Sequence, residues 1–408
     1  MDDFQDLQHQ QSSENPGSAA EVLKVSTRLG LTSFGGPVAH LGYFHEEYVK
    51  RRKWIDEKSY ADLVALCQFL PGPASSQLGI AVGIERAGIL GGIAAWAGFT
   101  LPSAIALVIF AFVLQRFDVH NAGWLHGLMI VAVAVVAQAV WSMARTLAPD
   151  RTRGTLAILT AIICLLLPSA FTQIVGIAGA GVFGHIFLGG QQQSQQAASL
   201  RVLIKRQTAI TAWVVFIVLL LGLPLLRILI PSQTLAVFES FYRAGSLVFG
   251  GGHVVLPLLQ NEVVPNGWLS NSEFLAGYGA AQAVPGPLFT FAAYLGAVMH
   301  PSPNGWIGAG LALLAIFLPA FLLVLGSLPF WNAIRGRAGF QAALRGINAA
   351  VLGILGAALY DPVWISAIHT LQEFSLALAA FGMLLLWKLP PWLVVVFGVI
   401  GGYLMNGI

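Results

Sequence analysis

Long apolar stretches, separated by short polar loops, recur along almost the whole chain. Ala209 to Leu223 and Ile307 to Leu325 are two of them, and about 20 apolar residues are enough for a helix to cross a bilayer. Residues 1–20 are polar and lack the basic segment followed by an apolar one that marks a signal peptide. The pattern predicts an all-α polytopic membrane protein preceded by a disordered tail.

The second half of the chain repeats the pattern of the first half. Phe34-Gly35-Gly36 returns 215 positions later as Phe249-Gly250-Gly251, and Pro71-Gly72-Pro73 returns 214 positions later as Pro285-Gly286-Pro287. Single residues also match at these spacings and in the same order: Arg28 and Arg243, Glu47 and Glu262, Trp54 and Trp268, and Gln68 and Gln282. Ordered matches of this kind indicate an internal duplication.

The two repeats are separated by a segment that has no counterpart in either of them. It begins with a polar, glutamine-rich stretch and continues as a single apolar segment. The domains that we expect are a tail (1–20), a first membrane repeat (21–188), a cytoplasmic linker (189–206), a connecting transmembrane helix (207–231) and a second, inverted membrane repeat (232–408).

Basic residues mark opposite loops in the two repeats. They gather at Lys50–Lys53 and between Arg145 and Arg153 in the first repeat, but between Arg335 and Arg345 in the second. The matching loops of the other repeat carry one basic residue at most. Because cytoplasmic loops are enriched in Lys and Arg, the reversal predicts two homologous halves of inverted topology. The N-terminus and linker should lie inside and the C-terminus outside.

Glycine and proline interrupt two apolar segments of each half near their middles. In the first half the breaks fall at residues 35–37 and 71–73. Such breaks are typical of interrupted or re-entrant helices, and the alternative is that every segment crosses fully and is only kinked. Together with the uninterrupted segments and the connecting helix, the chain should have about 13 membrane segments.

The interrupted segments are also the candidate binding site. In proteins with inverted repeats, ligands bind where interrupted helices of the two halves meet. A break exposes helix N-termini, whose free N–H groups and partial positive charge favour an anion. The backbone candidates are Gly35, Gly36, Pro71, Gly72, Pro73, Gly250, Gly251, Pro285, Gly286 and Pro287. The side-chain donors are Gln68, Ser75, Ser76, Gln282 and Thr290, and for the hydroxyls the alternative is a bond to their own helix.

Two arginines occupy equivalent positions inside apolar stretches. Arg28 and Arg243 each stand six residues before Phe-Gly-Gly, and charged residues within membrane segments are functional candidates by default. We expect both to bind a dianion; the alternatives are that they snorkel to the surface or pair with Glu47 or Glu262. The candidate coupling groups, which could carry a proton, are Glu47, Glu262, His40 and His253.

Other classes of function find little support. The net charge is only +3 and the basic residues lie in short loops, so we expect no nucleic-acid partner. The segment His45-Glu46-Glu47-Tyr48 lacks the second histidine of a metalloprotease motif, and no phosphate-binding GxxxxGK[ST] occurs. We expect neither an enzyme nor an ATP-driven pump, with no cofactor and no metal site.

Four stretches of the sequence resemble the chromate ion transporter family. They are residues 33–49 (SFGGPVAHLGYFHEEYV), 54–79 (ending in QFLPGPASSQLG), 249–264 (FGGGHVVLPLLQNEVV) and 281–296 (AQAVPGPLFTFAAYLG). The resemblance begins at about Glu21 and covers the rest of the chain, as in the family's long, two-domain form. The second-half FGGG differs from the first-half FGGP, so the two half-sites need not be equivalent.

This resemblance implies a function. It suggests a multi-pass inner-membrane exporter of chromate, driven by the proton-motive force or the membrane potential, that confers chromate resistance. Sulfate is the expected competitor, since both ions are tetrahedral dianions. The alternatives are a transporter of sulfate or another oxyanion, or an anion channel. The oligomeric state stays open, with a homodimer as one option.

Overall fold

The computed structural model describes residues 17–116, 123–189, 204–249, 252–331 and 337–405, and within these ranges the protein is helical and contains no strand. Five described helices are long and apolar enough to cross a membrane, by length and composition. This agrees with the prediction of an all-α polytopic membrane protein. The count of about 13 membrane segments stays a prediction.

Helices fill both halves of the chain in a matching order. The first half contains α2 (Ala19–Thr32), α3 (Gly36–Phe44), η1 (His45–Arg51), α4 (Glu57–Phe69), α5 (Ala74–Arg116), α6 (Gly123–Leu147), α7 (Arg151–Leu166) and α8 (Ala170–Phe187). The connecting helix is α9 (Arg206–Leu229). The second half contains α10 (Gln233–Leu247), η2 (Gly252–Val254), α11 (Val255–Val263), α12 (Asn271–Ala281), η3 (Leu288–Thr290), α13 (Phe291–Val298), α14 (Gly305–Ser327), η4 (Leu328–Phe330), α16 (Ala338–Ala358), η5 (Leu359–Trp364), α17 (Ile365–Ala367), α18 (Leu371–Leu385) and α19 (Pro391–Met405).

The helices around the predicted breaks are too short to span a bilayer alone. α2 has 14 residues and α4 has 13, which at about 1.5 Å per residue is about 20 Å, against about 30 Å of hydrocarbon. Between α2 and α3, Gly35 and Gly36 have φ angles of 97° and 77°, which side chains with a Cβ rarely adopt. The interruptions predicted from glycine and proline are therefore present as real helix ends.

The long α5 contains a further turn that matches a loop of the second half. Its backbone leaves the helical region at Ala87 and Gly88, so residues 74–86 and the remainder of α5 form a hairpin. A Cβ on Gly83 would lie 2.5 Å from Gly91 O, and one on Gly296 would overlap Gly308 O. The hairpin of α5 thus packs as α13 packs against α14, with glycines at both contacts.

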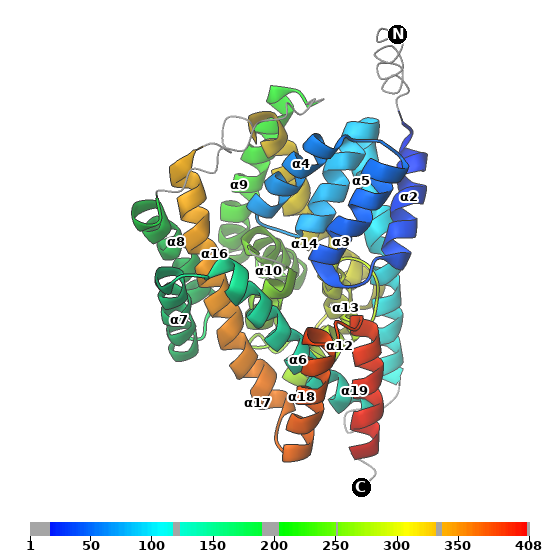
Figure 1. Ribbon diagram of the computed structural model, residues 1–408, viewed down its shortest axis with the longest axis vertical. Helices are drawn as coiled ribbons and strands as arrows, with labels where there is room; N and C mark the ends of the chain where they lie inside the picture. Colours follow the sequence, from blue (N-terminus) through cyan, green and yellow to red (C-terminus); the bar gives the residue numbers. More distant parts are fainter. Residues whose placement is uncertain (1–16, 117–122, 190–203, 250–251, 332–336, 406–408) are drawn as a thin grey trace.

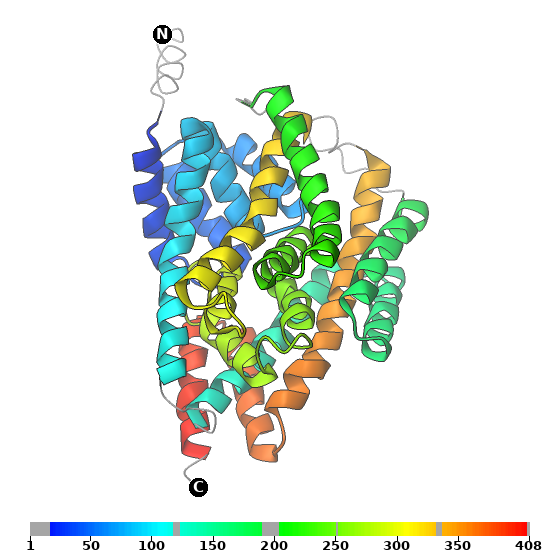
Figure 2. The same ribbon diagram turned by 180° about the vertical axis from the view of Figure 1, so that it is seen from behind.

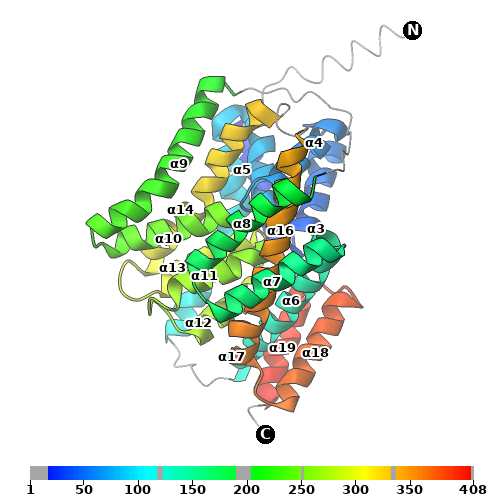
Figure 3. The same ribbon diagram turned by 90° about the vertical axis from the view of Figure 1, so that its left-hand side faces the viewer.

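The two halves are intertwined rather than side by side. A Cβ on Gly184 of α8 would overlap Ala342 O of α16, and one on Gly402 of α19 would overlap Gly123 O of α6. α7 and α8 of the first half therefore pack on α16 of the second (Figure 3), while α18 and α19 pack on α6 of the first (Figure 1). Each half completes the other through equivalent close contacts.

The ends of the chain lie at opposite ends of the molecule. The N-terminal ends of α2 and α9 are at the top of Figure 1, and the C-terminal end of α19 is at the bottom. Figure 2 shows the same arrangement from behind, with α9 descending from the top. The short helices α2, α3 and α4 occupy the upper part, whereas α12, α18 and α19 occupy the lower part. This inverted placement agrees with the topology expected from the basic loops.

Candidate functional site

The interrupted helices of the two halves meet through a reciprocal pair of backbone hydrogen bonds. Gly72 N donates to Val248 O at 2.7 Å, and Gly286 N donates to Ser33 O at 2.9 Å. Gly72 and Gly286 are counterparts in the repeat, and so are Ser33 and Val248. Each Pro-Gly-Pro break therefore sits on the Phe-Gly-Gly break of the other half, and we call this meeting point the crossing.

Glycine is required at both hydrogen-bonded positions of the crossing. Gly72 has a φ angle of 118° and Gly286 one of 101°, a region that favours glycine strongly. A Cβ on Gly286 would also lie 2.7 Å from Ser103 Oγ. The Pro-Gly-Pro motifs therefore serve a backbone path that brings a free N–H to the other half.

A small pocket of about 30 Å³ lies beside the crossing. It is lined by the start of α3 from the first half and the start of η3 from the second, so two helix N-termini face it. Its polar side chains are Gln282 and His253. Gln282 Nε2 has no hydrogen-bond partner among the described residues, and His253 Nδ1 lies 2.7 Å from Tyr278 Oη.

The structure brings several of the residues predicted from sequence together in this pocket. They are Gly35, Gly36, Gln282, Gly286 and the coupling candidate His253. Gln68, the counterpart of Gln282, is exposed and does not line the pocket. Gly250 and Gly251 lie outside the described residues.

The hydroxyl candidates differ from one another in their bonding. Thr290 Oγ1 donates to Pro287 O at 2.8 Å, which is the bond to its own helix that sequence analysis gave as the alternative. Ser75 Oγ lies 3.3 Å from His40 Nδ1. Ser76 Oγ is buried and has no partner within the described part of the chain. Gln77 Nε2 donates to Pro71 O at 2.8 Å and so holds the break in place.

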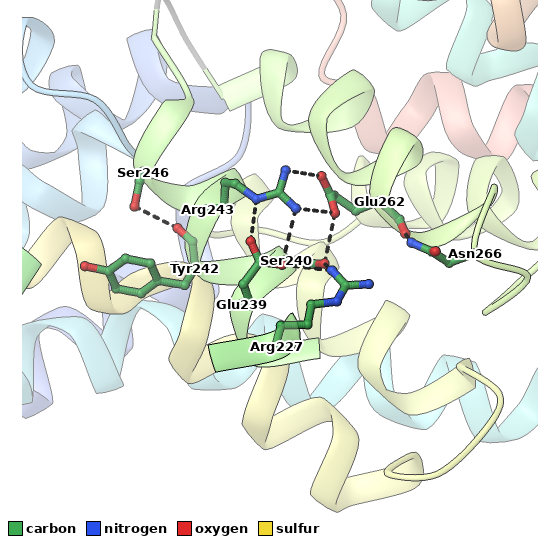
Figure 4. A network of polar contacts seen from close by, with 8 residues as sticks. All are labelled: Arg227, Glu239, Ser240, Tyr242, Arg243, Ser246, Glu262 and Asn266. Carbon is green, nitrogen blue, oxygen red and sulfur yellow. Dashed lines mark hydrogen bonds and ion pairs between the residues drawn. The ribbon is translucent and has the colours of Figure 1, made fainter. Parts of the chain in front are cut away.

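The repeated arginines are placed differently in the two halves. Arg28 is exposed and lines no described pocket. Arg243 lies between two carboxylates, at 2.5 Å from Glu239 Oε1 and 2.7 Å from Glu262 Oε1 (Figure 4). Glu47, the counterpart of Glu262, pairs with arginines of its own segment. The dianion-binding role of both arginines stays a prediction.

Sequence reasoning missed several buried polar groups at the crossing. Ser33 Oγ and Thr100 Oγ1 are buried and lack a partner among the described residues. A signal was present, since Ser33 directly precedes Phe34-Gly35-Gly36 and Thr100 directly precedes the repeated pair Leu101-Pro102. Both residues stand next to motifs that the duplication retained.

A larger cavity of about 620 Å³ lies toward the end of the molecule that holds the C-terminal end of α19. It is formed between the C-terminal end of α5 and the helices α12 to α14, and therefore between the two halves. α12 contributes Ala276 to this cavity and Gln282 follows α12 in the small pocket. The polar residues that line the cavity are Gln115, Arg116, Glu273, Tyr294, His300 and Asn304.

Two inverted repeats whose interrupted helices cross near a small, polar pocket define a helical membrane protein of the secondary-transporter type. The chain belongs to the chromate transporter family, because the family's sequence model matches residues 20–185 and again residues 235–403. Each half of the chain therefore matches the family separately, as the internal duplication requires.

Characterised and uncharacterised relatives span nearly the whole chain. A chromate transport protein of Pseudomonas aeruginosa is 28% identical over 91% of this chain and 88% of its own length. A chromate transport protein of Cupriavidus metallidurans is 25% identical over 83% of this chain and 81% of its own. An uncharacterised transporter of Methanocaldococcus jannaschii is 27% identical over 96% and 95%. No solved structure is significantly similar to the chain.

Proposed function

We propose that this protein exports chromate from the cytoplasm, with the ion bound at the crossing. The reciprocal hydrogen bonds of Gly72 and Gly286 carry this proposal, because through them interrupted helices of both halves meet at one place. Membership of the chromate transporter family and relatives named chromate transport proteins support the substrate. The location that we propose is the inner membrane, and the physiological result is chromate resistance.

The geometry of the pocket suits a small inorganic anion. At about 30 Å³ it has room for one or two waters in this conformation, and an organic solute would not fit. The starts of α3 and η3 supply N–H groups and the positive ends of helix dipoles. Gln282 Nε2 adds a buried donor that has no partner among the described residues. An anion would satisfy all of these groups together.

The 620 Å³ cavity supports a route to the far end of the molecule. Ala276 in the cavity and Gln282 in the pocket are six positions apart at the end of one helix, which is about 9 Å at the helical rise. If the basic loops are cytoplasmic, this cavity opens to the outside and is the outlet for an exported ion. Export would be coupled to the proton-motive force or the membrane potential, and His253 beside the pocket is a candidate proton carrier.

Sulfate is the second candidate substrate. Helix N-termini and amide donors recognise charge and tetrahedral oxygen positions, which chromate and sulfate share. We therefore expect sulfate to compete for the same pocket, whether or not it is itself carried across the membrane.

Transport into inside-out membrane vesicles tests the proposal. Energised vesicles that contain the protein should accumulate chromate, excess sulfate should reduce the rate, and a protonophore should abolish it. Gln282→Ala should raise the KM for chromate, while Gln341→Ala, a change on α16 away from the pocket, should not. Vesicles with folded protein that accumulate no chromate would refute the substrate, and chromate flux that ignores the energy source would indicate a channel.

A further inference from the structure

Four side chains at the crossing each bury a polar atom that has no hydrogen-bond partner among the described residues. These atoms are Ser33 Oγ, His40 Nε2, Ser76 Oγ and Thr100 Oγ1. Each of the four residues is at most 2% exposed. Since buried polar groups in native proteins are nearly always satisfied, four exceptions in one region point to an absent water or ligand.

The four groups are linked by contacts that place them around the crossing. Gly286 N donates to Ser33 O, and a Cβ on Gly286 would lie 3.2 Å from Phe99 O, next to Thr100. The ring of His40 packs edge-on against Phe99, with centroids 5.3 Å apart. His40 Nδ1 also faces Ser75, the neighbour of Ser76, at 3.3 Å. The helices α2, α3 and both parts of α5 therefore contribute to one polar region.

The chemistry of these groups is uniform. Serine and threonine hydroxyls donate one hydrogen bond, and a neutral imidazole donates from one of its ring nitrogens. In His40, Nδ1 can accept from Ser75, which leaves Nε2–H as a donor. A tetrahedral dianion presents four oxygens that only accept hydrogen bonds. The unpaired groups of the crossing and the oxygens of such an ion are therefore complementary.

Full positive charges are absent from the described part of this region. Arg28 is exposed, and the guanidinium of Arg243 is already shared by the carboxylates of Glu239 and Glu262. Neither arginine lines the pocket beside the crossing. The groups available to an ion at the crossing are therefore uncharged.

We propose that the transported tetrahedral dianion is held at the crossing by neutral donors: the hydroxyls of Ser33, Ser76 and Thr100 and the Nε2–H of His40. This inference rests on the proposed function and assigns its binding groups. A site without a fixed counter-charge binds the ion strongly enough to select it and weakly enough to release it, which conduction and transport both require. The arginines then act at a distance, through folding and the electrostatic field.

Equilibrium dialysis of radiolabelled chromate against the purified full-length protein tests this assignment. Thr100→Val removes one hydroxyl without changing the shape of the side chain, and should weaken binding at least about tenfold, as expected for a hydrogen bond to a charged group. Thr160→Val is the matched control, because Thr160 is also buried but its hydroxyl already donates to Leu156 O at 2.8 Å. Thr100→Ser should restore binding.

The outcomes separate this inference from the proposed function. A wild-type protein that binds neither chromate nor sulfate contradicts the function itself. Wild-type binding that Thr100→Val and Ser76→Ala both leave unchanged overturns the neutral-donor site alone. The neutral-donor site is likewise overturned if Arg243→Gln, in protein that unfolds at the wild-type temperature, abolishes binding while Thr100→Val does not. Weakened binding in Thr100→Val, with Thr100→Ser and Thr160→Val close to wild type, supports it.

Discussion

The two halves of the molecule hold the same repeated carboxylate with different partners. In the second half, Glu262 pairs with Arg243 at 2.7 Å, and Arg243 also pairs with Glu239. Arg227 from the connecting helix α9 contacts Glu239 at 2.9 Å (Figure 4). Two arginines and two glutamates thus form a neutral network, in which the carboxylates of Glu239 and Glu262 are 2% and 7% exposed.

In the first half, the corresponding carboxylate ignores the repeated arginine. Glu47 pairs with Arg51 at 3.1 Å and with Arg52 at 2.6 Å, both from η1 and its end. Arg52 also reaches Glu21, at 3.7 Å. These arginines are 53% and 29% exposed, so solvent screens their network more than the one in the second half.

The difference shows that local neighbours decide which pairs form after a duplication. Glu239, which holds Arg243, corresponds to Lys24 in the first half, and a lysine repels an arginine. Arg51 and Arg52 correspond to Asn266 and Gly267, which offer Glu262 no charge. Arg28 therefore loses both potential partners, although Arg28 and Glu47 were retained.

Breaking the buried network should give the largest effect. Glu239→Gln leaves two arginines with a single carboxylate, and we expect a loss of about 3 kcal/mol of unfolding free energy, because removing one partner of a buried pair leaves an uncompensated charge. Thermal and denaturant unfolding in detergent would measure it. Glu46→Gln is the matched control, since that carboxylate is 66% exposed in its pair with Lys50 and should change stability by less than about 0.5 kcal/mol.

The double variant Glu239→Gln with Arg227→Gln sharpens this prediction. It removes one charge of each sign, so its loss should be smaller than the sum of the two single losses. A sum that is simply additive would mean that Arg227 and Glu239 do not interact in solution.

The two crossing glycines should also respond unequally. Alanine at Gly72 or Gly286 is strained by the positive φ, at a cost of about 1–2 kcal/mol. At Gly286 the new Cβ would also meet Ser103 Oγ at 2.7 Å, whereas at Gly72 its nearest neighbour is Gln77 Nε2 at 3.0 Å. We expect Gly286→Ala to lower the unfolding temperature more than Gly72→Ala. The difference should shrink in a Ser103→Ala background, and equal losses would contradict the contact.

Sequence patterns predicted the large features of this fold because those features depend on local chemistry. Glycine and proline cannot continue a helix easily, so the breaks beside Gly35 and Pro71 were readable, and the repeat offset gave the second set. The intertwining of α8 with α16 was not readable, because it depends on glycine contacts between residues more than 150 positions apart.

The polar details of the site were less predictable for a similar reason. Whether a hydroxyl is paired depends on the backbone around it: Thr290 bonds back to Pro287 O, whereas Ser76 Oγ has no partner within the described ranges. The partner of Arg243 depended on Glu239, four residues away on the same helix, which has no repeat counterpart to draw attention to it. Repetition reveals what the halves share, and so it overlooks what only one half contains.

The first-half network should be weaker and more sensitive to salt. Glu47→Gln should cost about 1 kcal/mol, well below the loss expected for Glu239→Gln, because Arg51 and Arg52 remain partly hydrated when unpaired. Unfolding temperatures at low and high salt would check this. The loss in Glu47→Gln should fall as salt rises, since exposed charges are screened, while that in Glu239→Gln should not. A loss equal to that of Glu239→Gln would contradict the contrast between the networks.

Transplanting the missing partner is the smallest and most specific test of the comparison. If Lys24 is the reason that Arg28 stays unpaired, then Lys24→Glu recreates the relation of Glu239 to Arg243, with the acid four residues before the base on one helix. Such a pair adds about 0.2–0.5 kcal/mol, and Arg28→Gln, nearly neutral in the wild type, should become destabilising by that amount in the Lys24→Glu background. A double-mutant cycle on unfolding free energies measures the coupling. Zero coupling would mean that the path of α2, and not the identity of one neighbour, keeps Arg28 apart.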